Sequence, residues 1–70
     1  MAELYIKPEY IKLEQALKLT GIADTGGMAK DIILNGDVLV NGEICLMRGK
    51  KLREGDVFSF DGEKYEIKFR

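Results

Sequence analysis

The sequence predicts an α+β fold in which two helices pack on a small, mostly antiparallel, bent sheet. The first half carries two short runs with helical spacing of apolar residues, each followed by a glycine. The second half carries alternating apolar residues and two dipeptides typical of tight hairpins, Asn41-Gly42 and Asp61-Gly62. Seventy residues are enough for one domain, which we place at residues 1–70.

The first expected element is a short strand over residues 3–7, in which apolar and polar residues alternate. Pro8 ends this strand, because proline donates no hydrogen bond to a neighbouring strand. A helix is expected to begin at residues 9–12 and to run to Thr20, with its apolar side chains on one stripe. Gly21 stops it, since glycine adopts the left-handed C-cap conformation without penalty.

A second helix is expected from Gly26 to Asn35. Thr25 is placed to cap its start, because a hydroxyl at this position accepts a backbone N–H of the first turn. Gly36 ends it. The two helices and their short connection form a helix-turn-helix-like unit. The buried face of the second helix is formed by Ala29, Ile32 and Ile33.

The remainder of the chain is β. Val38 and Val40 begin the sheet, and the chain returns after Asn41-Gly42 with Ile44 and Leu46 on the return path. A further turn is expected at Gly55-Asp56. Two more strands follow, over 57–60 and 63–69, on either side of the second hairpin dipeptide.

The composition excludes several classes of function. There is no histidine and only one cysteine, Cys45, so a zinc site, an intramolecular disulfide and a Cys–His nucleophile are all excluded. We therefore expect no enzymatic activity, no cofactor and no metal. No run approaches the ~20 apolar residues of a membrane span, and the N-terminus lacks the features of a signal peptide. The expected location is the cytoplasm.

The charged residues are unevenly distributed, although the net charge is only −1. Residues 48–53, RGKKLR, contain four basic residues and no acidic one. Phosphate binding needs positive charge and donors held in fixed geometry. The start of the second helix offers such donors, and its dipole favours an anion. Candidate phosphate-binding residues are Thr25, Gly26, Gly27, Lys30, Arg48, Lys50, Lys51 and Arg53. The alternative is a solvated positive loop that serves only solubility.

Residues 11–60 resemble the RNA-binding domain named after ribosomal protein S-four, also called the αL motif. The typical pattern is an Arg-Leu-Asp helix start, a glycine, a Ser-Arg pair opening the second helix, GxVxVNG, basic residues and a Gly-Asp turn. Residues 36–42, GDVLVNG, match fully, as does Gly55-Asp56. The other matching positions are Lys12-Leu13-Glu14, a conservative match, with Gly21, Ala29 and Ile33.

One position departs from the pattern, because the Ser-Arg pair falls on Thr25-Gly26 and the usual RNA-contacting arginine is absent. The form TGGMAK, followed by RGKKL, instead resembles a bacterial stand-alone subgroup, the YaaA/YbcJ-like proteins. The resemblance implies that Lys30 and the RGKK segment replace the missing arginine. It also adds Lys12 to the expected RNA-binding residues.

These observations predict a small non-enzymatic bacterial protein that binds RNA. Structured RNA, with ribosomal RNA as one candidate, is the expected ligand, because few aromatic residues favour phosphate and shape recognition over base stacking. The rival function is a protein-interaction module in a ribosomal or replication-associated assembly. A third option is an accessory domain to an RNA-modifying enzyme.

Overall fold

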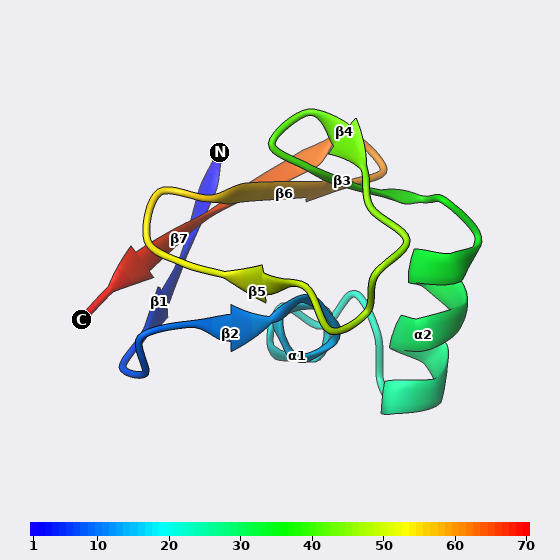
Figure 1. The fold of residues 1–70 in the computed structure, drawn as a ribbon, viewed down its shortest axis with the longest axis horizontal. Helices are drawn as coiled ribbons and strands as arrows, with labels where there is room; N and C mark the ends of the chain where they lie inside the picture. Colours follow the sequence, from blue (N-terminus) through cyan, green and yellow to red (C-terminus); the bar gives the residue numbers. More distant parts are fainter.

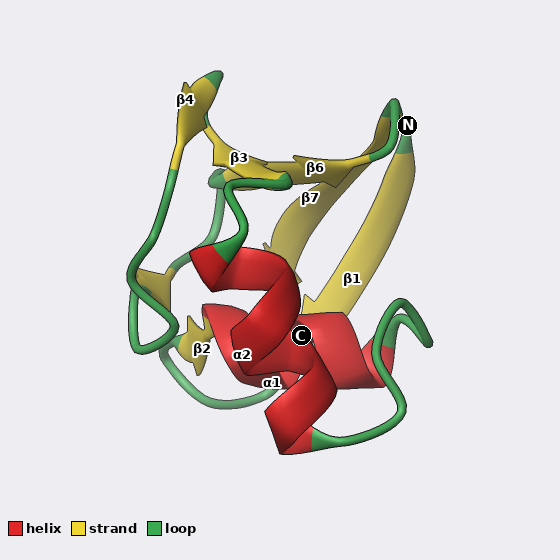
Figure 2. Cartoon of the chain, turned by 90° about the vertical axis from the view of Figure 1, so that its right-hand side faces the viewer, coloured by secondary structure: helices red, strands yellow, loops and turns green.

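The computed structural model describes residues 1–70 as a curved sheet with two helices packed beneath it (Figures 1 and 2). This α+β architecture confirms the predicted fold class. Neither helix has the length and apolar character needed to cross a membrane. The elements are β1 (Ala2–Ile6), β2 (Ile11–Lys12), α1 (Leu13–Leu19), α2 (Gly26–Leu34), β3 (Val38–Val40), β4 (Glu43–Ile44), β5 (Lys51–Leu52), β6 (Val57–Phe60) and β7 (Glu63–Phe69).

The main sheet has five strands in the order β1-β7-β6-β3-β4. The pairs β6–β7, β3–β6 and β3–β4 are antiparallel. The two ends of the chain meet in one parallel pair, since β1 lies beside β7 with Leu4 opposite Ile67. A second, two-stranded sheet joins β2 to β5.

The buried core lies between the sheet and the helices. Ala29 and Ile33 of α2 are fully buried in it, as predicted, whereas Ile32 is only partly buried at its edge. Ile11, Ala23 and Leu52 are also buried, although no periodic pattern marks them in the sequence. The complete core is Ile6, Ile11, Leu13, Ala16, Leu17, Ala23, Ala29, Ile33, Val38, Val40, Leu52, Phe58 and Ile67.

The first helix begins later than predicted. Its first residue is Leu13, and the range 9–12 was wrong because Ile11 and Lys12 are extended and pair with β5. Ile11 lies opposite Leu52, and both side chains are buried. Burial of this apolar pair favours the short strand over one more helical turn.

The second helix is capped as the sequence predicts. The hydroxyl oxygen of Thr25 accepts a hydrogen bond from the backbone N–H of Met28 at 3.1 Å. The helix ends at Leu34, one residue before the predicted Asn35, which is its C-cap. Gly36 follows with a φ of +82°, a left-handed conformation that favours glycine.

The two predicted hairpins are present, and the first is fixed by side-chain hydrogen bonds. Asn41 has a φ of +52°, and its side-chain Nδ2 donates to Oδ1 of Asp56 at 3.2 Å. Its Oδ1 accepts from the backbone N–H of Val57 at 2.9 Å. The other carboxylate oxygen of Asp56 accepts from the backbone N–H of Arg53 at 2.9 Å. Asn41 and Asp56 thus join the first hairpin to the turn that precedes β6.

We expect Ile33→Ala to lower the free energy of unfolding by about 2–5 kcal/mol, because it removes a fully buried aliphatic side chain and leaves a cavity. Urea denaturation followed by circular dichroism measures this change. A loss below about 1 kcal/mol would contradict the complete burial of Ile33 in the core.

Asn41→Ala should cost about 1–3 kcal/mol, because it removes two hydrogen bonds and places alanine at positive φ. Asp61→Ala is the matched control, since Asp61 has a φ of +51° in the other hairpin but makes no side-chain hydrogen bond. Equal losses in the two variants would show that the Asn41 hydrogen bonds add nothing.

Candidate nucleic-acid interface

The segment Arg48–Arg53, here called the basic loop, is fixed to the start of α1 by its backbone. The N–H of Leu13 donates to the carbonyl oxygen of Lys50 at 2.8 Å, and the N–H of Glu14 donates to that of Arg48 at 3.1 Å. Figure 1 shows the chain between β4 and β5 descending past α2 to reach this position. The basic loop therefore lies against the helices, although α1 precedes it by about 30 residues in the sequence.

A hollow of about 310 Å³, the helix hollow, opens where α1, α2 and the basic loop meet. None of its lining residues is apolar. It brings together four of the sequence-predicted residues, Gly26, Gly27, Lys30 and Arg48. Three residues of α1 complete the lining, namely Glu14, Gln15 and Lys18.

The start of α2 presents unused donors in the helix hollow. The N–H of Met28 is satisfied by Thr25, but those of Gly26 and Gly27 donate to no acceptor in the protein. A Cβ at Gly26 would meet no atom within 4 Å, and one at Gly27 would meet only the Thr25 hydroxyl oxygen at 3.9 Å. Packing therefore does not require glycine at either position, and its effect is to leave the backbone accessible.

A second hollow of about 540 Å³, the loop hollow, lies on the basic loop itself. Lys50, Lys51 and Arg53 line it together with Met47, Gly49 and Asp56. The one acidic side chain, Asp56, already accepts hydrogen bonds from Asn41 and from the backbone of Arg53. Arg48 of the helix hollow belongs to the same basic loop and precedes Lys50 by two residues in the sequence.

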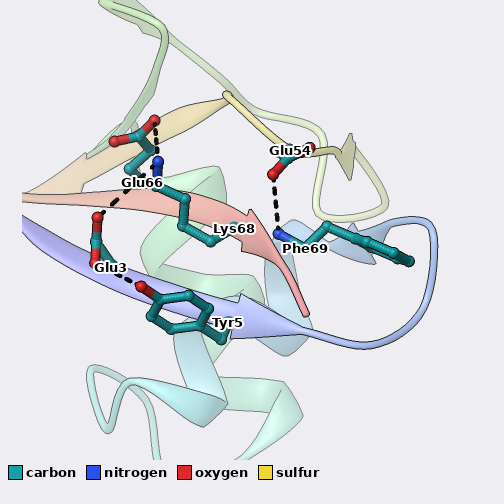
Figure 3. Close-up of polar contacts among 6 residues, drawn as sticks. All are labelled: Glu3, Tyr5, Glu54, Glu66, Lys68 and Phe69. Atoms are coloured by element: carbon teal, nitrogen blue, oxygen red, sulfur yellow. Dashed lines mark hydrogen bonds and ion pairs between the residues drawn. The ribbon is translucent and has the colours of Figure 1, made fainter.

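The basic residues of both hollows are free of ion pairs. Both ion pairs in the structure involve Lys68, whose ammonium lies 3.5 Å from Glu66 and 4.0 Å from Glu3 on the strands β7 and β1 (Figure 3). Lys68 is therefore the basic side chain that carboxylates neutralise through ion pairs, and it lies on the sheet away from the two hollows. Within the helix hollow the only acid is Glu14.

Two expected RNA-binding residues line neither hollow. Thr25 uses its hydroxyl oxygen to cap α2. Lys12 is the N-cap residue of α1 and lies opposite Lys51 in the β2–β5 pair, so it borders the basic loop from outside. Both residues therefore lie outside the lining of the two hollows, and Lys12 is the one whose ammonium remains free of an ion pair.

Sequence reasoning missed Gln15, Lys18 and Tyr10. Gln15 and Lys18 lie on α1 beside its buried stripe. The spacing of Glu14 and Lys18 at i and i+4 is a sequence signal that places Lys18 and Glu14 on one exposed face of this helix. The ring of Tyr10 makes cation–π contacts with two residues of the basic loop. Lys51 Nζ lies 4.9 Å and Arg53 Cζ lies 5.6 Å from the ring centre. No sequence signal links residue 10 to residues 51 and 53.

An apolar patch adjoins the basic loop on the side of β4. Ile44, Leu46 and Met47 are each more than half exposed, with relative exposures of 63%, 54% and 66%. Leu39 of the neighbouring strand β3 is 37% exposed. The predicted return path through Leu46 therefore leaves the sheet after Ile44 and presents apolar side chains to solvent.

Comparison with known proteins agrees with this architecture. The family model described as S4 domain matches residues 4–68. The probable ribosome maturation protein RlbA of Bacillus subtilis (strain 168) is 46% identical over 57 residues, which cover 81% of this chain and 80% of that protein. The solution structure of YbcJ from E. coli, described as revealing an αL motif involved in RNA-binding, superposes with a TM-score of 0.71 at 31% identity, covering 96% of this chain and 86% of YbcJ. The resemblance seen in the sequence is confirmed, and the chain belongs to the S4 domain family.

Proposed function

We propose that this protein is a non-enzymatic, cytoplasmic RNA-binding protein that recognises structured RNA through one basic face. This face comprises the helix hollow and the loop hollow, both of which are lined in part by the basic loop. The observation that carries the proposal is the convergence of Lys30, Arg48 and the free N–H groups of Gly26 and Gly27 in a hollow without apolar lining. Such a site combines positive charge with fixed donors, as phosphate groups require.

The shape of this face and the names of the relatives support structured RNA as the ligand. Phosphates at the helix hollow and at the loop hollow would be contacted by two separate parts of one rigid surface, which suits RNA whose backbone is held in a fixed form. A relative is named as a probable ribosome maturation protein, and YbcJ carries a motif described as involved in RNA-binding. Structured ribosomal RNA is therefore the first ligand to test.

The second candidate function is a protein-interaction module in a ribosomal or replication-associated assembly. The exposed apolar patch of Leu39, Ile44, Leu46 and Met47 favours it, because such groups of exposed apolar side chains are typical of protein contacts. The patch lies beside the basic loop, since Met47 lines the loop hollow. The two functions differ in whether the purified protein alone binds RNA.

Gly27→Ala should weaken RNA binding about tenfold while the fold becomes no less stable. The new methyl group meets only the Thr25 hydroxyl at 3.9 Å, and alanine stabilises helices by up to about 1 kcal/mol relative to glycine. It would, however, obstruct the approach of a phosphate to the free N–H groups. Leu34→Ala is the control, because Leu34 is exposed at the opposite end of α2. Fluorescence anisotropy with labelled RNA and thermal melts measure the two properties, and unchanged affinity for RNA would remove the start of α2 from the site.

Replacing both Lys50 and Lys51 by Glu should abolish RNA binding and leave the protein folded, since both side chains are exposed. The wild type should bind RNA with about micromolar affinity at low salt, because few cations are available and the net charge is −1. The logarithm of the affinity should fall with the logarithm of salt concentration, by about 0.7–0.9 for each phosphate contact. Titrations at several salt concentrations measure both quantities.

The matched control for charge compares Lys50→Glu with Lys64→Glu, which change the net charge equally. Lys64 is exposed on β7, makes no ion pair and lines neither hollow. Only Lys50→Glu should weaken binding strongly. Equal effects would indicate a general charge effect rather than a site, and no RNA binding by the wild type at low salt would favour the protein-interaction function.

A further inference from the structure

A third hollow of about 440 Å³ lies between the end of β1, the turn that follows it and the exposed side of α1. Its lining combines apolar side chains with positive charge. Tyr5, Tyr10 and Pro8 provide flat apolar surfaces, while the only charged side chains are Lys7 and Lys18. We call this the aromatic hollow. Phosphate binding at the helix hollow or the loop hollow does not require these aromatic residues.

The chemistry of the aromatic hollow suits an unpaired nucleobase. Proteins bind unstacked bases of RNA on aromatic side chains, because every base has a π-face that can stack on a ring. The phosphate of such a nucleotide carries negative charge, and the residues that line the hollow include two lysines and no acid. Lysine ammonium groups and aromatic faces in one concave site are the combination used by proteins that hold single-stranded nucleotides.

The aromatic hollow is continuous with the proposed RNA-binding face. Gln15 and Lys18 line both the aromatic hollow and the helix hollow. The Gln15 side-chain oxygen already accepts the backbone N–H of Lys12 at 3.2 Å, which holds the amide in place and leaves its NH₂ group to donate. A strand with one phosphate at the start of α2 can therefore extend past α1 towards the aromatic hollow.

Tyr10 connects the aromatic hollow to the basic loop as well. Its ring is 4.9 Å from the ammonium of Lys51 and 5.6 Å from the guanidinium of Arg53. Both cations belong to the loop hollow. The aromatic hollow therefore borders both proposed phosphate sites. It shares Gln15 and Lys18 with the helix hollow, and its Tyr10 contacts two cations of the loop hollow.

The ring of Tyr5 is held in place before any ligand arrives. Its hydroxyl donates to a carboxylate oxygen of Glu3 at 2.8 Å (Figure 3), and the residue as a whole is 54% exposed. The hydrogen bond to Glu3 and the negative charge of Glu3 raise the pKa of Tyr5, and the phenol is uncharged at neutral pH with or without this shift. A fixed, neutral aromatic surface stacks on a base with less loss of side-chain freedom than a mobile one.

We propose that the aromatic hollow binds one unpaired nucleobase of the structured RNA that the basic face holds. The inference rests on the proposed function, because the phosphates at the basic face bring the base to this position. It adds a feature of the ligand that phosphate contacts alone do not specify. The preferred RNA is a helix interrupted by at least one extrahelical nucleotide.

The test compares two RNA hairpins with the same stem, one fully paired and one with a single-nucleotide bulge. The wild type should bind the bulged hairpin about tenfold more tightly, since stacking of one base on an aromatic side chain contributes an effect of this size. Tyr5→Ala should remove most of this preference while leaving the affinity for the paired hairpin unchanged. Because Tyr5 is more than half exposed, this variant should remain folded, which a thermal melt verifies.

Two control variants separate the ring from other effects. Tyr5→Phe removes the hydrogen bond to Glu3 but keeps the ring, and it should retain the preference for the bulge. Phe69→Ala removes an aromatic ring of similar exposure, 52%, from the strand paired with β1, but Phe69 does not line the hollow. It should also retain the preference. Loss of the preference in Phe69→Ala would indicate a nonspecific contribution of exposed rings.

Nuclear magnetic resonance gives a second readout that does not depend on variants. The ring protons of Tyr5 and Tyr10 should shift with the bulged hairpin and much less with the paired one, whereas those of Tyr65 on β7 should not respond. Equal affinity for both hairpins, with no shift of the Tyr5 and Tyr10 rings, overturns the base-binding site while the proposed function stands. Failure to bind either hairpin overturns the proposed function and the base-binding site together.

Discussion

The docking of the basic loop on the start of α1 is the constraint on which the candidate site depends. The first backbone N–H groups of a helix have no partner within the helix and must find one elsewhere. In this protein two of them donate to carbonyl oxygens of the basic loop, at Arg48 and Lys50. The same bonds that satisfy α1 therefore fix the position of the loop. The buried pair Ile11–Leu52 fixes the loop at its other end, because β5 cannot move without exposing Leu52.

The two helix starts differ in whether their first backbone N–H groups already donate hydrogen bonds within the protein. At α1 the donors are used by the basic loop, whereas at α2 the N–H groups of Gly26 and Gly27 remain free. Each helix start carries the positive end of a helix dipole. Only the start of α2 combines this dipole with accessible N–H donors and with Lys30 and Arg48 in the same hollow. Because the net charge is only −1, this local arrangement matters more than the total charge.

Local signals predicted the elements whose causes are local. The Thr25 cap, the glycine after each helix and the two hairpin dipeptides each depend on a few neighbouring residues, and all are present in the structure. The pairs β1–β7 and β2–β5 were not predicted, because strands of two residues have no measurable periodicity and the partners of β1 lie about 60 residues away. The same limit applies to the site. The charge of residues 48–53 is visible in the sequence, but the positions of Gln15, Lys18 and Tyr10 beside it follow from the docking of the loop.

The residues that carry the family resemblance are chiefly structural. Asn41 and Asp56, from the Asn-Gly and Gly-Asp parts of the pattern, bind each other and the backbone of Arg53 and Val57. They hold the first hairpin against the end of the basic loop. Neither lies in the helix hollow, although Asp56 also lines the loop hollow. The departure from the family pattern falls instead at Thr25-Gly26, where the absence of a side chain leaves the unpaired first-turn N–H of Gly26 accessible. The scaffold residues can therefore be retained while the groups that face a ligand change, so membership of the family specifies the fold more closely than the RNA.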